Sequence, residues 1–266
     1  MNLLVAGFLV LGLFGPVIAA DIDAGKEKAA ACMACHGETG ISTRADVPNL
    51  AGQKVKYLTN QLNAFRAGER KNPFMNAMAS QLSDADIENL AAFFSSLEES
   101  TATAMSPVPE SVIKTRVTFP DNYPQAFTHY TTINFPKRKQ VRYYYANETA
   151  LTAARRGETL PDGSVLLVEI FKAKLDADQK AMMGADGFFE KDKLVAFTAM
   201  EHQKGWGDGF PDLIRNNDWN YAVFKADKTL RSGMNQARCL VCHKPHVESS
   251  YVFSLNQLTD KAKAAK

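Results

Sequence analysis

The stretch Cys239-Leu240-Val241-Cys242-His243, near the C-terminal end of this 266-residue chain, is a Cys-x-x-Cys-His motif. Two thiols at this spacing can form thioether bonds to the vinyl groups of a haem, and the following imidazole can then bind the iron. The motif also occurs near the other end, as Cys32-Met33-Ala34-Cys35-His36. The pair predicts two covalently attached haem c groups. The predicted attachment residues are Cys32, Cys35, Cys239 and Cys242, and the predicted iron ligands are His36 and His243.

Two other uses of the four cysteines explain the pattern less well. A disulfide within a Cys-x-x-Cys pair closes a loop too short to restrain much of the unfolded chain. A zinc site usually places its two cysteine pairs within a few tens of residues, whereas these pairs lie near opposite ends. Neither use explains why a histidine follows both pairs, and haem attachment explains it directly.

Length, composition and net charge limit the number of domains and the kinds of partner that can be expected. The length fits two modest domains, and 45% hydrophobic residues are enough for real cores. The formal net charge of +2 gives no bulk electrostatic reason to expect a nucleic-acid partner.

Residues 1–20 are apolar, end in small residues and precede Asp21. This pattern is typical of a secretory signal peptide cleaved after Ala19 or Ala20. An uncleaved anchor is the alternative, because no Lys or Arg precedes the apolar run. Haem c is attached outside the bacterial cytoplasmic membrane, so we expect a periplasmic protein.

The hydrophobic period changes along the chain. Residues 21–98 have helical spacing, including a helix over 55–66 and another that begins after an N-cap at Ser83. Residues 99–114 are small, polar and proline-containing, as in a linker. Residues 115–266 predict an α+β domain on an antiparallel sheet, with a helix over 148–156 and another before Cys239. The predicted strands are 130–135, 141–145, 165–171, 194–200 and 219–224.

A haem that only carries electrons needs a second axial ligand beside His36. Residues 72–79, expected to be irregular, offer Met75 and Met78. A thioether ligand stabilises ferrous iron and raises the potential. Either methionine taken singly is equally well explained as core packing.

Residues 23–97 resemble a short bacterial class I cytochrome c, an all-α fold. The residues that carry the resemblance are 31–37, 48–53, 57–58, 61–62, 65–66 and 82–87. In that family the ligand methionine precedes the last helix by a fixed interval, which falls on Met75 here. The resemblance implies a low-spin haem with His36 and Met75 as ligands, which transfers one electron and catalyses nothing.

The second haem has no methionine-bearing loop like that of the first domain. His246 lies close to His243 in sequence and is expected on the same side of the haem, while His129 and His202 are isolated. Any of the later methionines can pack in the core or bind iron. The pattern favours an open coordination position.

Residues 116–255 are similar to the cytochrome P-460 family, which includes cytochrome c′-beta. The matching segments are 119–123, 141–147, 160–165, 205–207, 217–222, 239–245 and 251–253. The resemblance implies an antiparallel sheet, a five-coordinate haem and a small ligand such as hydroxylamine or nitric oxide. It also implies a homodimer through the C-terminal domain.

Three positions refine that expectation. In the hydroxylamine-oxidising members a lysine is linked to the haem edge, and its place is taken here by Val168, which cannot form the link. Arg142 falls where some members have an arginine in the distal pocket; a surface charge on a strand edge is the alternative. Met234 aligns with another distal position, as an apolar wall or a sixth ligand.

Three functions follow. The first is a redox protein in which a small ligand meets the second haem while the first exchanges electrons with it and with a periplasmic or membrane partner. Such an oxidoreductase would act on hydroxylamine, nitric oxide or peroxide, in a direction that the sequence does not define. The second function is a non-enzymatic binder or sensor of gas. The third is an electron carrier with both haems six-coordinate.

Overall fold

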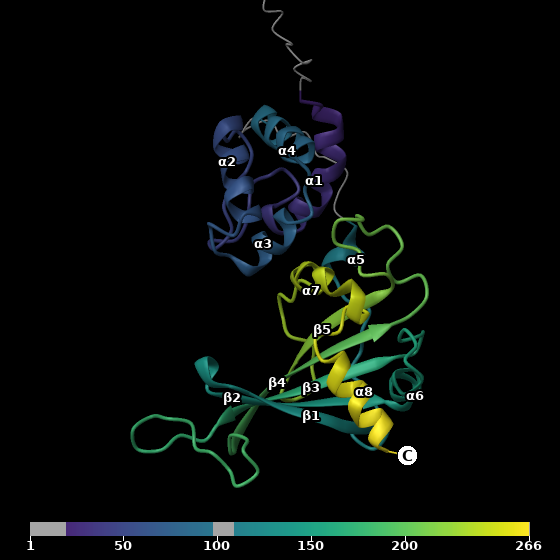
Figure 1. The fold of residues 1–266 in the computed structure, drawn as a ribbon. Helices are drawn as coiled ribbons and strands as arrows, with labels where there is room; N and C mark the ends of the chain where they lie inside the picture. The colour runs from purple at the N-terminus through teal and green to yellow at the C-terminus, as the bar shows by residue number, and fades with distance from the viewer. Residues whose placement is uncertain (1–19, 98–108, 266) are drawn as a thin grey trace, which may run out of the picture.

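The computed structural model describes residues 20–97 and 109–265. A helical N-terminal domain is followed by a C-terminal domain built on a sheet, as predicted (Figure 1). Residues 1–19 of the predicted signal peptide, and residue 98 with residues 99–108 of the predicted linker, lie outside the described residues. Within the described ranges, no helix combines the length and the apolar character needed to cross a membrane.

The N-terminal domain consists of α1 (Ile22–His36), α2 (Val55–Arg66), α3 (Pro73–Ala79) and α4 (Asp84–Ser96). Helices α1 and α4 pack closely at Gly25, where an added Cβ would lie 2.2 Å from the Asn89 carbonyl oxygen. Glycine is therefore required at this crossing for steric reasons. The first haem motif forms the C-terminal end of α1, so the packing of α1 on α4 fixes where the motif lies.

The expectation that residues 72–79 are irregular was wrong, because α3 is a regular helix there. The Asn72 side chain accepts hydrogen bonds from the backbone N–H groups of Phe74 and Met75, and Pro73 occupies the first turn. Both features favour helix initiation. Met75 and Met78 therefore lie on a short helix one turn apart.

Helix α4 begins as predicted, with Ser83 as its N-cap. The Ser83 hydroxyl accepts from the Asp86 N–H (3.1 Å) and the Asp86 carboxylate accepts from the Ser83 N–H (2.9 Å), which is a capping box. The apolar face of α4 is buried and consists of Ile87, Leu90, Ala91 and Phe94.

Ser83→Ala is expected to lower the free energy of unfolding of the chain by about 1 kcal/mol, because it leaves helix N–H groups unpaired. Chemical denaturation of the haem-loaded protein measures this. Ser83→Asp keeps a good N-cap and should stay close to the parent value. Equal losses in both variants would contradict a capping role for Ser83.

The C-terminal domain has a five-stranded antiparallel sheet in sequential order. All five predicted strands are present: β1 (Phe127–Phe135), β2 (Gln140–Asn147), β3 (Val165–Ala173), β4 (Lys191–His202) and β5 (Trp219–Lys225). The register pairs Tyr144 with Val168 and Val168 with Thr198. These three side chains therefore share one face of the sheet.

Helical segments complete the domain: α5 (Glu110–Ile113), the 3-10 helices Pro136–Arg138 and Lys244–Ser249, α6 (Glu148–Arg156), α7 (Ala237–His243) and α8 (Leu255–Ala264). The sequence pattern predicted α6 and α7. It did not predict α8, which packs on α6 and β1, or α5, which falls inside the predicted linker. Val112 of α5 is fully buried, so this end of the linker is part of the core.

The two faces of the sheet support different cores. Tyr221, Leu166 and Met200 belong to the main core, which continues under α7 and α8. On the other face, Leu167 and Phe197 join an aromatic cluster with Tyr123. Helix α7, which carries the second haem motif, therefore packs on the same face of the sheet as Val168.

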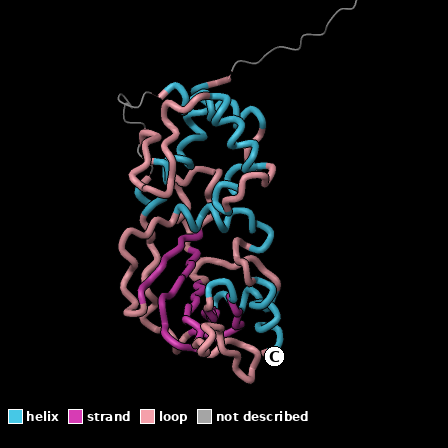
Figure 2. The backbone as a smooth tube through the Cα atoms, turned by 90° about the vertical axis from the view of Figure 1, so that its left-hand side faces the viewer, coloured by secondary structure: helices cyan, strands magenta, loops and turns pink. Residues whose placement is uncertain are grey.

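The two domains meet through α7, which contacts α3 and α1 (Figures 1 and 2). The helix that carries the second haem motif thus touches both the helix that carries the first motif and the helix that carries Met75.

Candidate haem sites

His36, the last residue of α1, is oriented by a backbone carbonyl. Its Nδ1 lies 2.8 Å from the Pro48 carbonyl oxygen, to which the neutral ring donates. Burial lowers the pKa of His36, although this hydrogen bond opposes the shift. A neutral imidazole that donates through Nδ1 leaves its Nε2 lone pair free for a metal.

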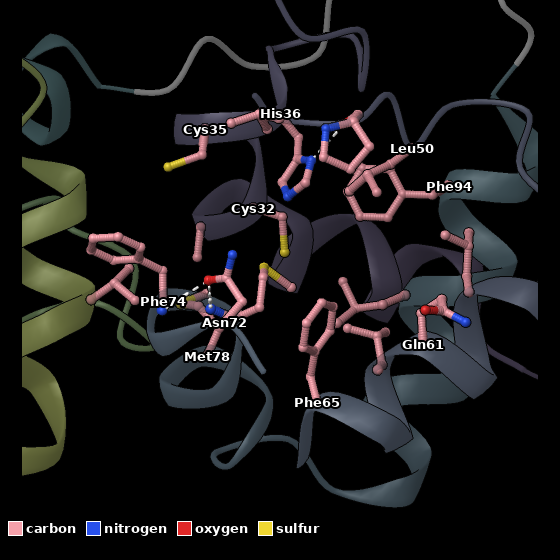
Figure 3. Close-up of a pocket in the computed structure, with 18 of the residues that line it drawn as sticks. Cys32, Cys35, His36, Leu50, Gln61, Phe65, Asn72, Phe74, Met78 and Phe94 are labelled. Atoms are coloured by element: carbon pink, nitrogen blue, oxygen red, sulfur yellow. Dashed lines mark hydrogen bonds between the residues drawn. The ribbon is translucent and has the colours of Figure 1, made fainter. Parts of the chain in front are cut away.

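A cavity of about 280 Å³ lies in front of His36. The Cys32 and Cys35 side chains and His36 border it, and most of its lining is apolar (Figure 3). Burial raises the pKa of the Cys32 thiol to about 12, so the thiol is protonated and uncharged. An apolar cavity bordered by two thiols and one free imidazole nitrogen fits a haem attached by thioether bonds.

Both Met75 and Met78 line this cavity, and Met78 is the more deeply buried. The helical spacing of α3 places the two side chains on the same side of the helix. The choice of Met75 as the iron ligand stays a prediction from the family resemblance.

Met75→Ala is expected to lower the reduction potential of the first haem strongly and to remove the sulfur-to-iron charge-transfer band, because a thioether ligand favours ferrous iron. Met78→Ala should retain that band and change mainly the packing. Potentiometric titration with absorption spectroscopy measures both. Loss of the band in the Met78 variant alone would assign Met78 as the ligand.

His243, the last residue of α7, repeats the arrangement of His36. Its Nδ1 lies 2.7 Å from the Tyr251 carbonyl oxygen. Burial lowers the pKa of His243 to about 4, with a smaller opposing effect from this hydrogen bond. His243 is therefore neutral at pH 7 with Nε2 free. Burial also raises the pKa of the Cys239 thiol to about 11.

Aromatic rings hold the His243 imidazole from two sides. The Tyr221 ring centroid is 4.5 Å away and the Phe253 centroid is 4.7 Å away. Tyr251, whose carbonyl receives the Nδ1 hydrogen bond, has φ +62°. A left-handed backbone is unfavourable for so bulky a residue and is kept where the surroundings require it. The strained turn presents its carbonyl to His243.

The remaining histidines have other partners. His246 makes a tilted contact with the Phe253 ring (centroids 4.0 Å apart), and the same ring contacts His243. His202 pairs with Asp162 (2.9 Å) and His129 with Thr132 (2.9 Å). His202 and His129 are therefore engaged as ordinary polar side chains, whereas His246 contacts an aromatic ring.

Val168 lies half-buried on β3. Lys172 is exposed, and Lys174, beyond the end of β3, has its Nζ 3.3 Å from Glu190. Irregular register at Phe171 also separates both lysines from the regular part of the strand. Neither lysine is therefore placed to substitute for one at Val168.

Arg142 lies on β2, an interior strand, and is partly buried. It shares the face of Tyr144 and Val168 because it is two residues from Tyr144. Its guanidinium carbon lies 3.9 Å from the Phe135 ring centroid, and its Nη2 donates to Gln140 (3.1 Å). The Nε is buried with no hydrogen-bond partner among the described residues. These features differ from those of a free surface charge.

Met234 is half-buried and packs against the aromatic cluster on the opposite face of the sheet from Arg142. The structure does not bring these two residues together. A distal-pocket role for Met234 stays a prediction.

The sequence pattern missed several residues that shape the sites. Pro48 and Tyr251 accept the histidine hydrogen bonds through their backbone carbonyls, which any residue can provide. Their residue types therefore do not reveal this role in the sequence. Arg238 and Val241 of α7 line the cavity of the first domain, together with Asn235. Only the contact between the domains shows that arrangement.

A helical domain and a sheet domain, each presenting a Cys-x-x-Cys-His helix with a carbonyl-oriented histidine, define a c-type cytochrome of electron transfer. The chain belongs to the cytochrome P460 family, whose model matches residues 120–254. Residues 22–98 match the cytochrome c family, so the predicted fusion is confirmed.

Curated relatives match the N-terminal domain. A cytochrome c4 of Pseudomonas aeruginosa is 43% identical over 104 residues, which is 39% of this chain and 52% of the relative. Cytochrome c-554(548) of Halomonas halodenitrificans is 43% identical over 83 residues, 30% of this chain and all of the relative. A thiosulfate dehydrogenase electron acceptor of Stutzerimonas stutzeri is 42% identical over 69 residues, 25% of this chain and 32% of the relative. The chain spans about half the length of the cytochrome c4 relative.

Proposed function

We propose that this is an exported dihaem cytochrome in which a His36/Met75 haem exchanges electrons with a five-coordinate haem on His243. The second haem binds or converts a small nitrogen-oxide ligand, such as nitric oxide or hydroxylamine. The proposal rests on two observations on one side of the sheet. The His243 imidazole donates through Nδ1 and leaves Nε2 free, and Arg142 has a buried Nε with no partner among the described residues.

The chain's own residues have separable tasks. The thiols attach the cofactor, and the carbonyls of Pro48 and Tyr251 orient the two histidines. When bound, haem supplies reversible one-electron chemistry and, at an open position, a site for a small ligand. Arg142 would donate hydrogen bonds to an anionic ligand from the sheet face, and such charge-assisted bonds are the stronger kind.

The electron partner is proposed to be a periplasmic or membrane redox protein. Relatives named cytochrome c4 and thiosulfate dehydrogenase electron acceptor support a role in passing electrons between proteins. We also propose a homodimer through the C-terminal domain, which sedimentation of the purified protein would test.

Carbon monoxide binding to the fully reduced protein tests the open site. We expect one carbon monoxide per chain, with the spectral change confined to the haem on His243, because Met75 blocks the other iron. Titration followed by absorption and resonance Raman spectroscopy gives the stoichiometry and the proximal ligand. Absence of binding at either haem would favour the electron carrier with two six-coordinate irons.

A non-catalytic gas binder is the second candidate, favoured by Val168. Without a lysine at that position or a substitute nearby, the cross-linked haem of the hydroxylamine-oxidising members cannot form here. Anaerobic mixing with hydroxylamine and an electron acceptor separates the two: substrate loss beyond one equivalent supports an enzyme, and none supports a binder.

A further inference from the structure

The helix of the second haem motif also forms part of the wall of the first haem site. Arg238 and Val241, one before and one within the Cys239–His243 motif, line the cavity in front of His36. Val241 is buried there. One of the two residues between Cys239 and Cys242 therefore lies against the first haem site, so α7 forms part of both sites.

Hydrogen bonds fix this wall in place. Asn235 donates from Nδ2 to the carbonyl of Ala34 (2.9 Å), a residue between Cys32 and Cys35, and its Oδ1 accepts from the Ala237 N–H (2.9 Å). One side chain thus joins the first motif to the start of α7. The fully buried Gln236 donates to the Lys114 carbonyl (2.8 Å), which anchors the same segment to the end of the linker.

Arg238 places a positive charge in this wall. Its guanidinium carbon lies 4.7 Å from the ring centroid of Phe74 on α3, a cation–π contact. The Cys35 thiol points toward this side of the cavity (Figure 3). Nearby Arg44 is paired with Asp46 at 2.7 Å, whereas none of the ion pairs found among residues 20–97 and 109–265 includes Arg238.

We propose that Arg238 sets the balance of electrons between the two haem sites, by stabilising the reduced form of the first haem from within this wall. This inference rests on the proposed exchange of electrons between the haems. With both haems bound, one electron would pass from the second haem iron, which would be oxidised, to the first, which would be reduced. No bond is made or broken. Arg238 directly precedes Cys239 of the second site, but its guanidinium lines the first cavity and lies over Phe74. We therefore expect the charge to stabilise the reduced first haem more than the reduced second haem.

The test is the distribution of a single electron between the two haems of the intact, haem-loaded protein. In Arg238→Gln we expect the equilibrium constant that favours the first haem to fall about tenfold, as for a unit charge about 10 Å away at an effective dielectric constant of about 20. For a one-electron couple this is about 59 mV. Potentiometric titration read at each haem's own absorption bands measures it.

Two variants serve as controls. Arg238→Lys keeps the charge and should stay near the parent value. Arg70→Gln removes another cation that lines the same cavity and stacks on a phenylalanine, Phe65 (4.6 Å), but it lies on the loop after α2 rather than on α7. It should shift the first haem potential, and the electron distribution with it, while the second haem potential stays at the parent value. Arg238→Gln should also move the second haem potential, by a smaller amount, because Arg238 directly precedes Cys239.

The outcomes are distinguishable. An unchanged electron distribution in Arg238→Gln, with parental circular dichroism and haem content, would overturn the role of Arg238. Equal shifts in Arg238→Gln and Arg238→Lys would assign the effect to packing and overturn it as well. If the parent protein shows no transfer between its haems after rapid one-electron reduction, the proposed function itself fails.

Discussion

Replacing both Cys239 and Cys242 by serine is expected to remove all covalent haem from the C-terminal domain and to leave the N-terminal domain with its own. The protein should then carry one covalent haem instead of two, because each pair of thiols serves one cofactor. Mass spectrometry of the denatured chain counts the attached groups. Haem-stained fragments after proteolysis in the linker assign each group to a domain.

The matched control replaces Cys32 and Cys35 by serine, which should reverse the pattern. Serine is close to cysteine in size, and Cys239 and Cys242 are only partly exposed, so the packing of α7 through Leu240 should be kept. Loss of both haems in either variant would show that α7 couples the two attachments. Retention of two haems after loss of one pair would contradict the assignment of the motifs.

This variant also tests ligand binding. Without the second haem, carbon monoxide should no longer bind to the reduced protein, whereas the spectrum of the first haem should persist. Continued binding would place the open position in the N-terminal domain and contradict the proposed roles of the two sites.

Much of the fold could be predicted from the sequence because the local signals agree with the tertiary structure. Ser83 and Asp86 form a capping box from local residues alone. The strands of the C-terminal domain are runs of β-branched and aromatic residues between turn residues, which is a local signal as well. Helix α3 was missed because its start depends on Asn72 and Pro73 in a seven-residue segment. So short a segment has too few turns to show a helical period.

Helix α8 was missed for a different reason. It is polar along most of its length and buries Leu258 and Ala262 against the rest of the domain. Its Ala262 carbonyl accepts from Arg155 of α6 (3.0 Å). Such a helix is stabilised mainly by tertiary contacts, which a single sequence does not display.

The candidate haem sites likewise contain residues that the sequence predicts and residues that only the tertiary structure reveals. The proposed attachment residues can be identified from the sequence because covalent haem attachment requires thiols and an imidazole at a fixed spacing. The motif does not fix the residue type at the position before Cys239, so the sequence gives no reason to single out Arg238. The role proposed for Arg238 depends on the packing of α7 against α3, which places its guanidinium over Phe74.

Arg142→Leu is expected to weaken binding of an anionic ligand such as nitrite to the second haem by about tenfold to a hundredfold. Hydrogen bonds to a charged group contribute about 1.5–3 kcal/mol, and tenfold corresponds to about 1.4 kcal/mol. Binding of carbon monoxide, which is uncharged, should change little. Spectroscopic titration with both ligands measures the contrast.

The neighbouring cation Arg138 provides the control, because it is exposed at the turn before β2. Arg138→Leu removes the same charge from the same region and should leave nitrite affinity within about threefold, since a solvated charge is screened. Arg142→Lys should recover only part of the affinity, because an ammonium lacks the planar fork of a guanidinium. Equal losses for nitrite and carbon monoxide would mean that Arg142 shapes the pocket sterically. Since its Nε is buried and has no partner among the described residues, a hydrogen bond to a bound anion would satisfy a donor that folding leaves unpaired.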